Sequence, residues 1–374
     1  MTFATHWRLR VCSLKTRPTA RSGVSIRNTL PAVIEDAPDL AIETARKVLG
    51  GAWAVDATRR DGSDRLYVRL RNAQDETVMA MIWPSQRKGG EAGADADPAR
   101  MVVEVTQALA SAGLPVPQLL GQRDDLRVLL LEDLGHTHLS DLFGDGVPVD
   151  RYAEALELLH RFQRTTFATN CPILTRSYDS GLWHWEFDHF REWGVEHRSG
   201  EPLPSRIAGH LDQVFRDLAE RLASAPAVPV HRDYHCRNLM IDPLGRLRWI
   251  DYQDALTGHP FYDVASLLWD AYVEIDNDVR MMLFEEWLSA AAPDLKTAFA
   301  DAEAEVALVA MHRMLKAAGR FVLFVQQKSL GEFAAHIPGL LTRVEALAAT
   351  YRDRLPVFDQ IVEPLRPYVP EWRT

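Results

Sequence analysis

The fold of this 374-residue chain is decided by residues 231–251, which read HRDYHCRNLMIDPLGRLRWID. Residues 238–241 and 247–250 read as two short strands, and the DPLG segment between them has the proline and glycine of a tight turn. We therefore expect a hairpin that brings three oxygen-bearing side chains, Asp233, Asn238 and Asp251, to one edge of a small sheet. An ordinary polar loop is the alternative, and the agreement of spacing, turn and strands argues against it.

These three side chains have the chemistry of a site that holds a metal and a nucleotide. Mg²⁺ prefers oxygen ligands and usually takes only one or two carboxylates together with phosphate oxygens. Asn238 and Asp251 could therefore hold the metal on a nucleotide. That arrangement leaves Asp233 to accept a proton from an attacking hydroxyl.

The same layout is similar to the kinase pattern H-R-D-x-x-x-x-N followed by a metal-binding Asp. Protein kinases continue with Phe-Gly after that Asp, whereas this chain has Tyr252-Gln253 after Asp251 and no A-P-E segment. The further residues that carry a resemblance are His235, Asp254 and Asp263. With them the chain resembles the aminoglycoside phosphotransferase family, which also includes choline kinases and several sugar kinases.

The resemblance implies an α+β fold of the bilobal, protein-kinase-like kind. Its N-lobe has an antiparallel sheet with a helix, and its larger C-lobe is mostly helical. The implied cofactors are ATP and Mg²⁺, with Asp233 as the catalytic base and Asn238 and Asp251 as metal ligands. The resemblance also implies that His231 and Asp263 support the catalytic loop.

The resemblance covers about residues 37–330 and suggests a division of the chain. We expect a basic, disordered tail over residues 1–36, an N-lobe over 37–134 and a C-lobe over 135–374. Residues 1–34 contain six Arg or Lys and no Asp or Glu. An unstructured tail or an upstream start codon explains this composition, and a transit peptide would share it.

Apolar periodicity predicts the remaining elements. A hairpin is expected over residues 65–70 and 77–83, and the segment rich in Gly, Ala and Asp over 89–98 is expected to be a surface loop. Helices are expected at 39–49, 98–112, 152–165, 204–224, 262–272, 278–291, 295–327, 340–351 and 357–366.

One position in the predicted N-lobe departs from the family pattern. Met81 stands where the family has the lysine that grips the phosphates, and methionine carries no charge. Arg65, Arg69 or Lys88 could replace that lysine, and the sequence does not choose among them. Glu104 loses its usual partner and is either a solvated helix charge or a group near the metal.

The expected hinge between the lobes supplies the other nucleotide contacts. Residues 127–131 read as a buried strand, and Glu132-Asp133-Leu134-Gly135 follows where a bilobal kinase reads the adenine edge with its backbone. The expected nucleotide-binding residues are Leu131, Asp133, Leu134, Met81 and Arg65.

Residues 175–201 are the predicted acceptor-binding segment, because they combine three tryptophans with charged groups of both signs. Aromatic faces with a few directed polar groups suit a sugar. An amphipathic helix with its tryptophans in the core is the alternative. The expected substrate-binding residues are Glu186, Trp185, Arg191, His235 and Asp254.

Composition limits the partners. The net charge of −10 argues against non-specific binding to nucleic acid or to an anionic membrane, since both need a basic surface. The three cysteines form no C-x-x-C pair, which indicates a reducing compartment with neither disulfides nor a zinc site. We expect a cytoplasmic monomer whose partners are ATP and a small-molecule sugar.

The sequence therefore predicts a small-molecule kinase. The anomeric sugar kinases of cell-wall recycling, which phosphorylate N-acetylmuramate and N-acetylglucosamine at C1, have a similar strand to Met81-Ile82-Trp83-Pro84. An aminoglycoside kinase is the nearest alternative, although it needs a strongly acidic acceptor site to bind a polycation. A choline-type kinase would need an aromatic cage. A nucleotide-binding pseudokinase is suggested by the absent lysine and opposed by Asp233, Asn238 and Asp251.

Overall fold

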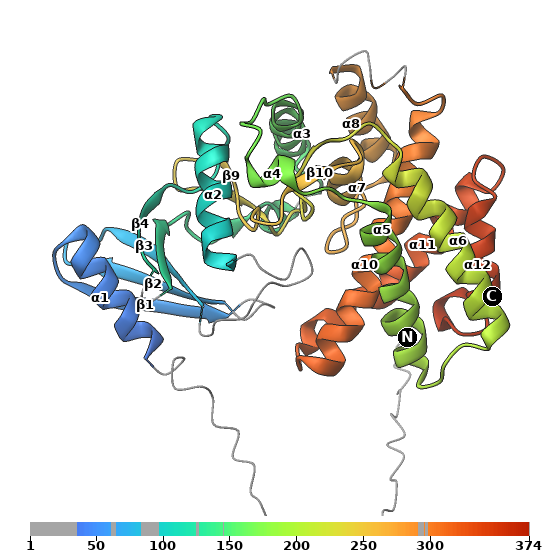
Figure 1. The fold of residues 1–374 in the computed structure, drawn as a ribbon, viewed down its shortest axis with the longest axis horizontal. Helices are drawn as coiled ribbons and strands as arrows, with labels where there is room; N and C mark the ends of the chain where they lie inside the picture. Colours follow the sequence, from blue (N-terminus) through green and yellow to red (C-terminus); the bar gives the residue numbers. More distant parts are fainter. Residues whose placement is uncertain are drawn as a thin grey trace, which may run out of the picture.

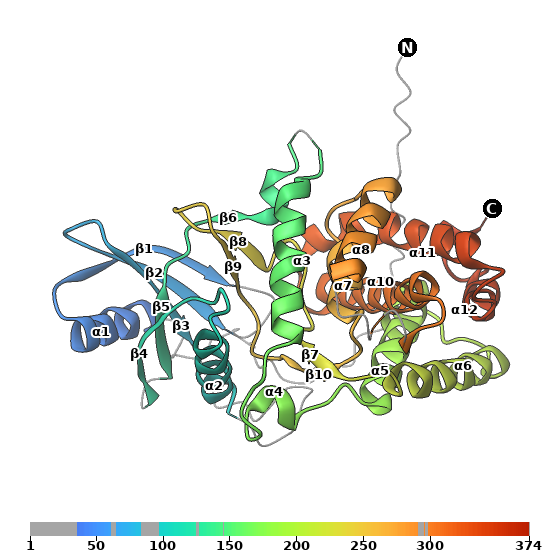
Figure 2. The same cartoon turned by 90° about the horizontal axis from the view of Figure 1, so that it is seen from above.

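The computed structural model describes residues 36–373, apart from 61–64, 84–96, 125–126, 145, 291–294 and 296–297. The tail expected over 1–36 lies outside this part except for Asp36, and so do Pro84, Lys88 and most of the 89–98 loop. Figures 1 and 2 place a five-stranded sheet with α1 and α2 at one end of the molecule, and helices α5 to α8 and α10 to α12 at the other. The short strands β6 to β10 lie between them (Figure 2). The fold is the predicted bilobal one.

The N-lobe is built on an antiparallel sheet with the strand order β1-β2-β3-β5-β4. Its elements are α1 (Ala37–Leu49), β1 (Trp53–Arg60), β2 (Leu66–Asn72), β3 (Thr77–Ile82), α2 (Pro98–Ser111), β4 (Leu119–Arg123) and β5 (Val128–Glu132). Alternate residues of a strand point to opposite faces, so Val68 and Ala80 pack with Ala41 of α1. Met81 lies on the other face and packs with Val102 of α2.

The C-lobe surrounds a central helix, α10 (Ala302–Gln327), most of which is buried. The helices around it are α3 (Val149–Gln163), α4 (Pro172–Thr175), α5 (Ser180–His189), η4 (Phe190–His197), α6 (Ser205–Ala223), α7 (Tyr262–Leu268), α8 (Asn277–Ala290), η5 (Gly331–His336), α11 (Ile337–Tyr351), α12 (Val357–Leu365) and the single turns η3 (Leu139–Leu142) and η6 (Pro370–Trp372). None of the helices in the described part of the chain has the length and hydrophobicity that crossing a bilayer requires.

Short strands carry the segment that decides the fold. They are β6 (Thr137–His138), β7 (Val228–Val230), β8 (Leu239–Ile241), β9 (Leu247–Trp249) and β10 (Leu256–Gly258). The predicted hairpin is formed by β8 and β9, with Leu239 opposite Trp249 and Ile241 opposite Leu247. Gly245 has φ of +77° in its turn, which a residue without a side chain adopts readily.

Two helices, α7 and α10, differ most from their predicted bounds. α7 ends at Leu268, four residues earlier than expected, and the Asp270 carboxylate then accepts the Tyr272 N–H at 2.8 Å. α10 begins at Ala302 because the Asp301 carboxylate accepts the Ala304 N–H at 3.0 Å and caps the helix there. Periodicity located the apolar faces and could not locate these caps.

A close backbone contact holds α10 against the π-helical segment η4. A Cβ atom added to Gly319 would lie 2.9 Å from the Phe190 Cα and 3.0 Å from the His189 carbonyl oxygen. Both contacts are to backbone, which cannot move aside as a side chain can. Glycine at this position therefore sets how closely the two helices approach.

We predict that Gly319→Ala lowers the free energy of unfolding by about 1–3 kcal/mol, because the added methyl group overpacks this contact. Gly209→Ala in α6 is the matched control, since a Cβ there meets nothing within 4 Å. The control should be neutral or stabilising by up to about 1 kcal/mol. Urea unfolding of the two variants and the wild type measures both effects, and equal stabilities would contradict the packing argument.

Candidate active site

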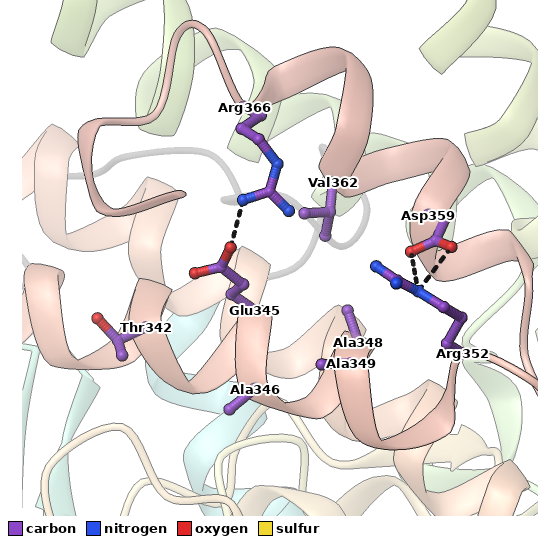
Figure 3. A pocket seen from close by; sticks show the side chains of 9 residues that line it. All are labelled: Thr342, Glu345, Ala346, Ala348, Ala349, Arg352, Asp359, Val362 and Arg366. Atoms are coloured by element: carbon purple, nitrogen blue, oxygen red, sulfur yellow. Dashed lines mark hydrogen bonds and ion pairs between the residues drawn. The ribbon is translucent and has the colours of Figure 1, made fainter. Parts of the chain in front are cut away.

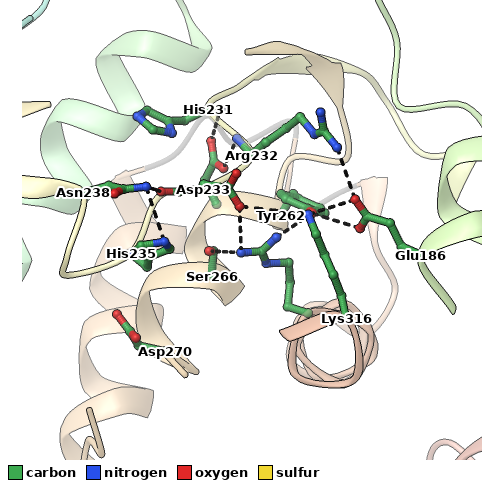
Figure 4. Close-up of polar contacts among 12 residues, drawn as sticks. Glu186, His231, Arg232, Asp233, His235, Asn238, Tyr262, Ser266, Asp270 and Lys316 are labelled. Atoms are coloured by element: carbon green, nitrogen blue, oxygen red, sulfur yellow. Dashed lines mark hydrogen bonds and ion pairs between the residues drawn. The ribbon is translucent and has the colours of Figure 1, made fainter. Parts of the chain in front are cut away.

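The loop that carries Asp233 is fixed by a buried carboxylate. Asp263 of α7 accepts the backbone N–H of His231 at 2.6 Å and that of Arg232 at 3.0 Å (Figure 4). These bonds hold Arg232 in the left-handed region, with φ of +77°. Burial raises the pKa of Asp263 to about 7, and the two N–H groups oppose that rise by favouring the charged carboxylate.

His231 supports the loop from its other side as an apolar residue would. Its ring packs edge-on against Tyr234 and Trp249, with centroid distances of 5.5 and 5.8 Å. Burial lowers the pKa of His231 to about 4, so the ring is neutral at physiological pH. His231 therefore contributes packing and no charge.

The hairpin brings Asn238 and Asp251 to the same edge. The Ile250 N–H donates to the Asn238 carbonyl at 3.0 Å, which places Asn238 beside the end of β9, where Asp251 follows. The Asn238 side-chain N–H donates to the Asp233 carbonyl at 2.9 Å, and this bond leaves the amide oxygen for another partner. Asn238 is thus hydrogen-bonded to the Asp233 backbone, and Asp251 follows the residue that pairs with Asn238.

This donor set fits Mg²⁺ bound to phosphates. The described residues contain no group of three or more His, Cys, Asp or Glu that could hold a metal alone. One amide oxygen and one carboxylate are what Mg²⁺ takes from a protein when phosphate and water complete its shell. Asp251 accepts Arg65 at 2.7 Å and Gln253 at 2.9 Å on the same oxygen, Oδ1.

Two cations of α10 face the Asp233 carboxylate. Arg313 approaches its Oδ1 to 3.5 Å and Lys316 to 4.0 Å. Burial would raise the pKa of Asp233, but the charges of Lys316, Arg313 and Arg232 lower it below its usual range. Asp233 is therefore ionised at neutral pH and accepts a hydrogen bond without first losing a proton.

Glu186 lies beneath this group and is fully buried. Lys316 approaches it to 2.8 Å and Arg232 to 3.2 Å (Figure 4). The Tyr178 hydroxyl also donates to it. Burial would raise the pKa of Glu186, and the neighbouring cations, Lys316 first, lower it to about 2. Sequence reasoning placed Glu186 against the substrate, whereas its full burial makes it the counter-ion of the cations around Asp233.

The predicted nucleotide-binding residues lie partly in the N-lobe sheet and partly in the hinge. Met81 and Leu131 are buried on the sheet face that packs with α2, and Leu134 is buried in the hinge. The Asp133 carboxylate receives an ion pair from Arg69 at 2.8 Å, so both side chains are used to fix the hinge. Arg65 and Arg69 are the two described arginines that could replace the lysine. Since Arg69 is used at the hinge, Arg65 is the one that lies beside Asp251, a metal-ligand candidate.

Glu104 has a local partner. Arg100, one turn earlier on α2, donates to it at 2.6 Å, and the pair lies on the surface of the helix. Of the two interpretations left open by the sequence, this contact favours the solvated helix charge.

The acceptor candidates are spread over two regions. Trp185 is exposed and stacks on His189 at 5.3 Å, whereas Trp183 is fully buried in the core. Arg191 pairs with Asp188 and with Glu196. The tryptophans of this segment therefore divide between core and surface.

His235 lies beside Asn238, and Asp254 lies beside Gln253, which contacts Asp251. Asn238 and His235 are 3.3 Å apart between side-chain nitrogens, and the His235 ring packs on Tyr272 at 5.1 Å. Asp254 accepts Gln253 at 3.2 Å, and Gln253 also holds Asp251. Both candidates thus contact neighbours of the metal-ligand pair.

A separate hollow lies between α11 and α12 (Figure 3). Its charged residues are already paired, Glu345 with Arg366 and Arg352 with Asp359. None of the predicted site residues lines it. It offers none of the groups that the catalytic loop provides.

Comparison with known proteins agrees with this geometry. Residues 58–302 match the model of the phosphotransferase enzyme family, APH. The N-acetylmuramate/N-acetylglucosamine kinase of Pseudomonas aeruginosa is 29% identical over 293 residues, which are 77% of this chain and 82% of the relative. The enzyme of that name from Neisseria meningitidis serogroup B is 30% identical over 252 residues, 66% of this chain and 75% of the relative.

Solved structures share the fold at low identity. A choline/ethanolamine kinase family protein from Mesorhizobium loti has a TM-score of 0.56 and 15% identity, over 90% of this chain and 99% of that one. An ADP-bound aminoglycoside phosphotransferase has a TM-score of 0.53 and 12% identity, over 81% of this chain and 96% of that one. These likenesses confirm the bilobal fold.

We predict that Glu186→Gln destabilises the protein at neutral pH, because it leaves buried cations without their counter-ion. Since the pKa of Glu186 is lowered to about 2, its ionisation stabilises the fold above about pH 4.5. That contribution, about 3 kcal/mol, is lost as the pH falls from about 4.5 toward 2.

Urea unfolding from pH 7 to pH 3 measures this effect. The stability difference between wild type and Glu186→Gln should shrink as the pH falls below about 4.5. Glu220→Gln, at an exposed position of α6, is the control and should match the wild type throughout. A difference that stays constant with pH would contradict the assigned charge of Glu186.

Proposed function

The chain belongs to the phosphotransferase enzyme family, and we propose that it transfers the γ-phosphoryl group of ATP to the anomeric hydroxyl of N-acetylmuramate or N-acetylglucosamine, as in cell-wall recycling. Its family and its kinase-named relatives make it a small-molecule kinase. The observation that carries the proposal is the position of Asn238, which is hydrogen-bonded to the Asp233 backbone and paired with Ile250, the residue before Asp251. The names of the relatives support the choice of sugar.

The proposed chemistry is mainly positioning and charge stabilisation. Asp233 accepts a hydrogen bond from the acceptor hydroxyl and takes its proton as the new O–P bond forms and the bond to ADP breaks. Asn238 and Asp251 would hold Mg²⁺, which supplies positive charge to the phosphate oxygens. The low pKa of Asp233 fits a group that orients the hydroxyl first and becomes protonated late.

The N-lobe and the hinge are proposed to hold the nucleotide. Leu131, Leu134 and Met81 offer apolar surface to the adenine ring, and the hinge backbone reads its edge. Arg69 keeps that backbone in place, since it contacts Asp133 and donates to the Gly135 carbonyl at 2.6 Å. The absent strand lysine is replaced by Arg65 in this proposal.

The charges around Asp233 oppose the alternative acceptors. An aminoglycoside is a polycation, and Arg313 and Lys316 stand close to the carboxylate that its hydroxyl would approach. A choline headgroup carries a fixed positive charge and meets the same repulsion. A pseudokinase is opposed by the intact Asp233 and Asn238 network.

We predict that Asp233→Asn lowers kcat by about a hundredfold or more, because general-base catalysis and orientation of the hydroxyl are both lost. ATP binding should remain close to that of the wild type. Phosphorylation of N-acetylglucosamine and titration with ATP measure the two effects separately. Asp217→Asn on α6 is the control, and full activity of Asp233→Asn would remove Asp233 from the mechanism.

We also predict that Arg65→Gln raises the KM for ATP and lowers kcat, because the phosphates lose the cation that now pairs with Asp251. Arg71→Gln, in the strand β2 that begins directly after Arg65, is the control, since Arg71 pairs with Asp56 at the surface. Initial rates at varied ATP concentration test the pair. Equal behaviour of the two variants would contradict the role of Arg65.

A further inference from the structure

Arg237 differs from the other cations of the site because none of the described carboxylates forms an ion pair with it. Arg65, Arg232, Arg313 and Lys316 each lie within 4.0 Å of an Asp or Glu. Within the described part of the chain, Arg237 makes no such ion pair, although it stands in the catalytic loop immediately before Asn238. Its charge is therefore available to a bound anion.

The guanidinium of Arg237 is nevertheless held in one place. Its central carbon lies 3.9 Å from the centre of the Tyr272 ring, and one of its terminal nitrogens lies 3.3 Å from His336 Nε2. Burial and the charge of Arg237 lower the pKa of His336, so that nitrogen accepts the hydrogen bond. A guanidinium stacked on an aromatic face keeps its remaining N–H groups directed outward in its own plane.

The Tyr272 ring, which forms the platform under Arg237, is itself held in place. Asp270, which is buried, accepts the Cys236 N–H at 2.7 Å and the Tyr272 N–H at 2.8 Å. One carboxylate thus ties the backbone that carries Arg237 to the backbone that carries Tyr272. Phe321 of α10 packs against the Tyr272 ring at 5.4 Å. A surface arginine that is merely solvated needs none of this support.

The position of Arg237 favours the acceptor over the nucleotide. Its side chain contacts Tyr272 and His336, which come from the C-lobe after the catalytic loop. The proposed nucleotide contacts come from the N-lobe and the hinge, with Arg65 reaching Asp251 from that side. The His235 ring, which contacts Tyr272 and Asn238, connects the Arg237 platform to the catalytic groups.

We propose that Arg237 binds the carboxylate of an acidic acceptor sugar and so selects it over a neutral one. This inference rests on the proposed sugar kinase activity. N-acetylmuramate carries a carboxylate on its lactyl ether, whereas N-acetylglucosamine lacks that group. The planar fork of an arginine matches a carboxylate with two parallel hydrogen bonds, which a lysine cannot form.

The test compares three acceptors with the full-length enzyme, ATP and Mg²⁺. They are N-acetylmuramate, its methyl ester, which keeps the shape and removes the charge, and N-acetylglucosamine. The readout is the ratio of kcat/KM for the acid to kcat/KM for the ester. Arg237→Gln should lower this ratio by about tenfold or more, the loss expected for a charge-assisted hydrogen bond. Arg237→Lys, which keeps the charge, should lower it by less.

Control variants separate recognition from general damage. Arg206→Gln removes a positive charge from the exposed surface of α6 and should keep the wild-type ratio. Tyr272→Phe retains the aromatic face and should keep the ratio as well, whereas Tyr272→Leu should lower it.

Three results would overturn the inference. Equal losses on acid and ester in Arg237→Gln would assign Arg237 to the phosphoryl group instead, and a wild type without preference for the acid would remove the selectivity. Both leave the proposed function standing. A wild type that phosphorylates none of the three acceptors overturns the proposed function and this inference with it.

Discussion

The site depends on one buried carboxylate that holds the backbone before Asp233. Asp263 accepts two consecutive N–H groups and compensates the left-handed conformation of Arg232, which costs an L-residue about 1–2 kcal/mol. With that turn in place, the chain leaves β7 and presents Asp233 to the same edge as the β8–β9 hairpin. Rotation of this loop would separate the proposed base from the proposed metal ligands, although none of them contacts Asp263 directly.

A second constraint on the site is electrostatic. Three cations, Arg232, Arg313 and Lys316, face two carboxylates, Glu186 and Asp233. Glu186 is fully buried and needs these partners, because an unpaired buried charge is strongly unfavourable. Asp233 is the partly exposed member of the group, with 36% of its side chain accessible. The network therefore keeps an ionised carboxylate partly exposed, as the proposed role of Asp233 requires.

The sequence predicted what is local and could not predict what is paired over long distances. The hairpin followed from a turn and two apolar runs, and its register confirmed the relation of Asn238 to Asp251. The cluster of cations around Glu186 and Asp233 was not predicted. Lys316 lies on a long buried helix and meets Glu186 only because α10 packs against α5. The signal for this cluster in the sequence was the presence of charges, Arg313 and Lys316 among them, inside a largely apolar helix.

The loss of the strand lysine is explained by the surroundings of Met81. Met81 packs among Val102 and Leu129 in an apolar cluster, where an ammonium group would lose its hydration. Glu104, the acidic partner that such a lysine would need, is instead paired with Arg100 on the helix surface. The acidic half of the usual ion pair is thus present but has a different partner. A cation enters the site from the start of β2, where Arg65 reaches across to the C-lobe and meets Asp251. In the proposed function, Arg65 therefore supplies the positive charge near the phosphates that the strand lysine would have supplied.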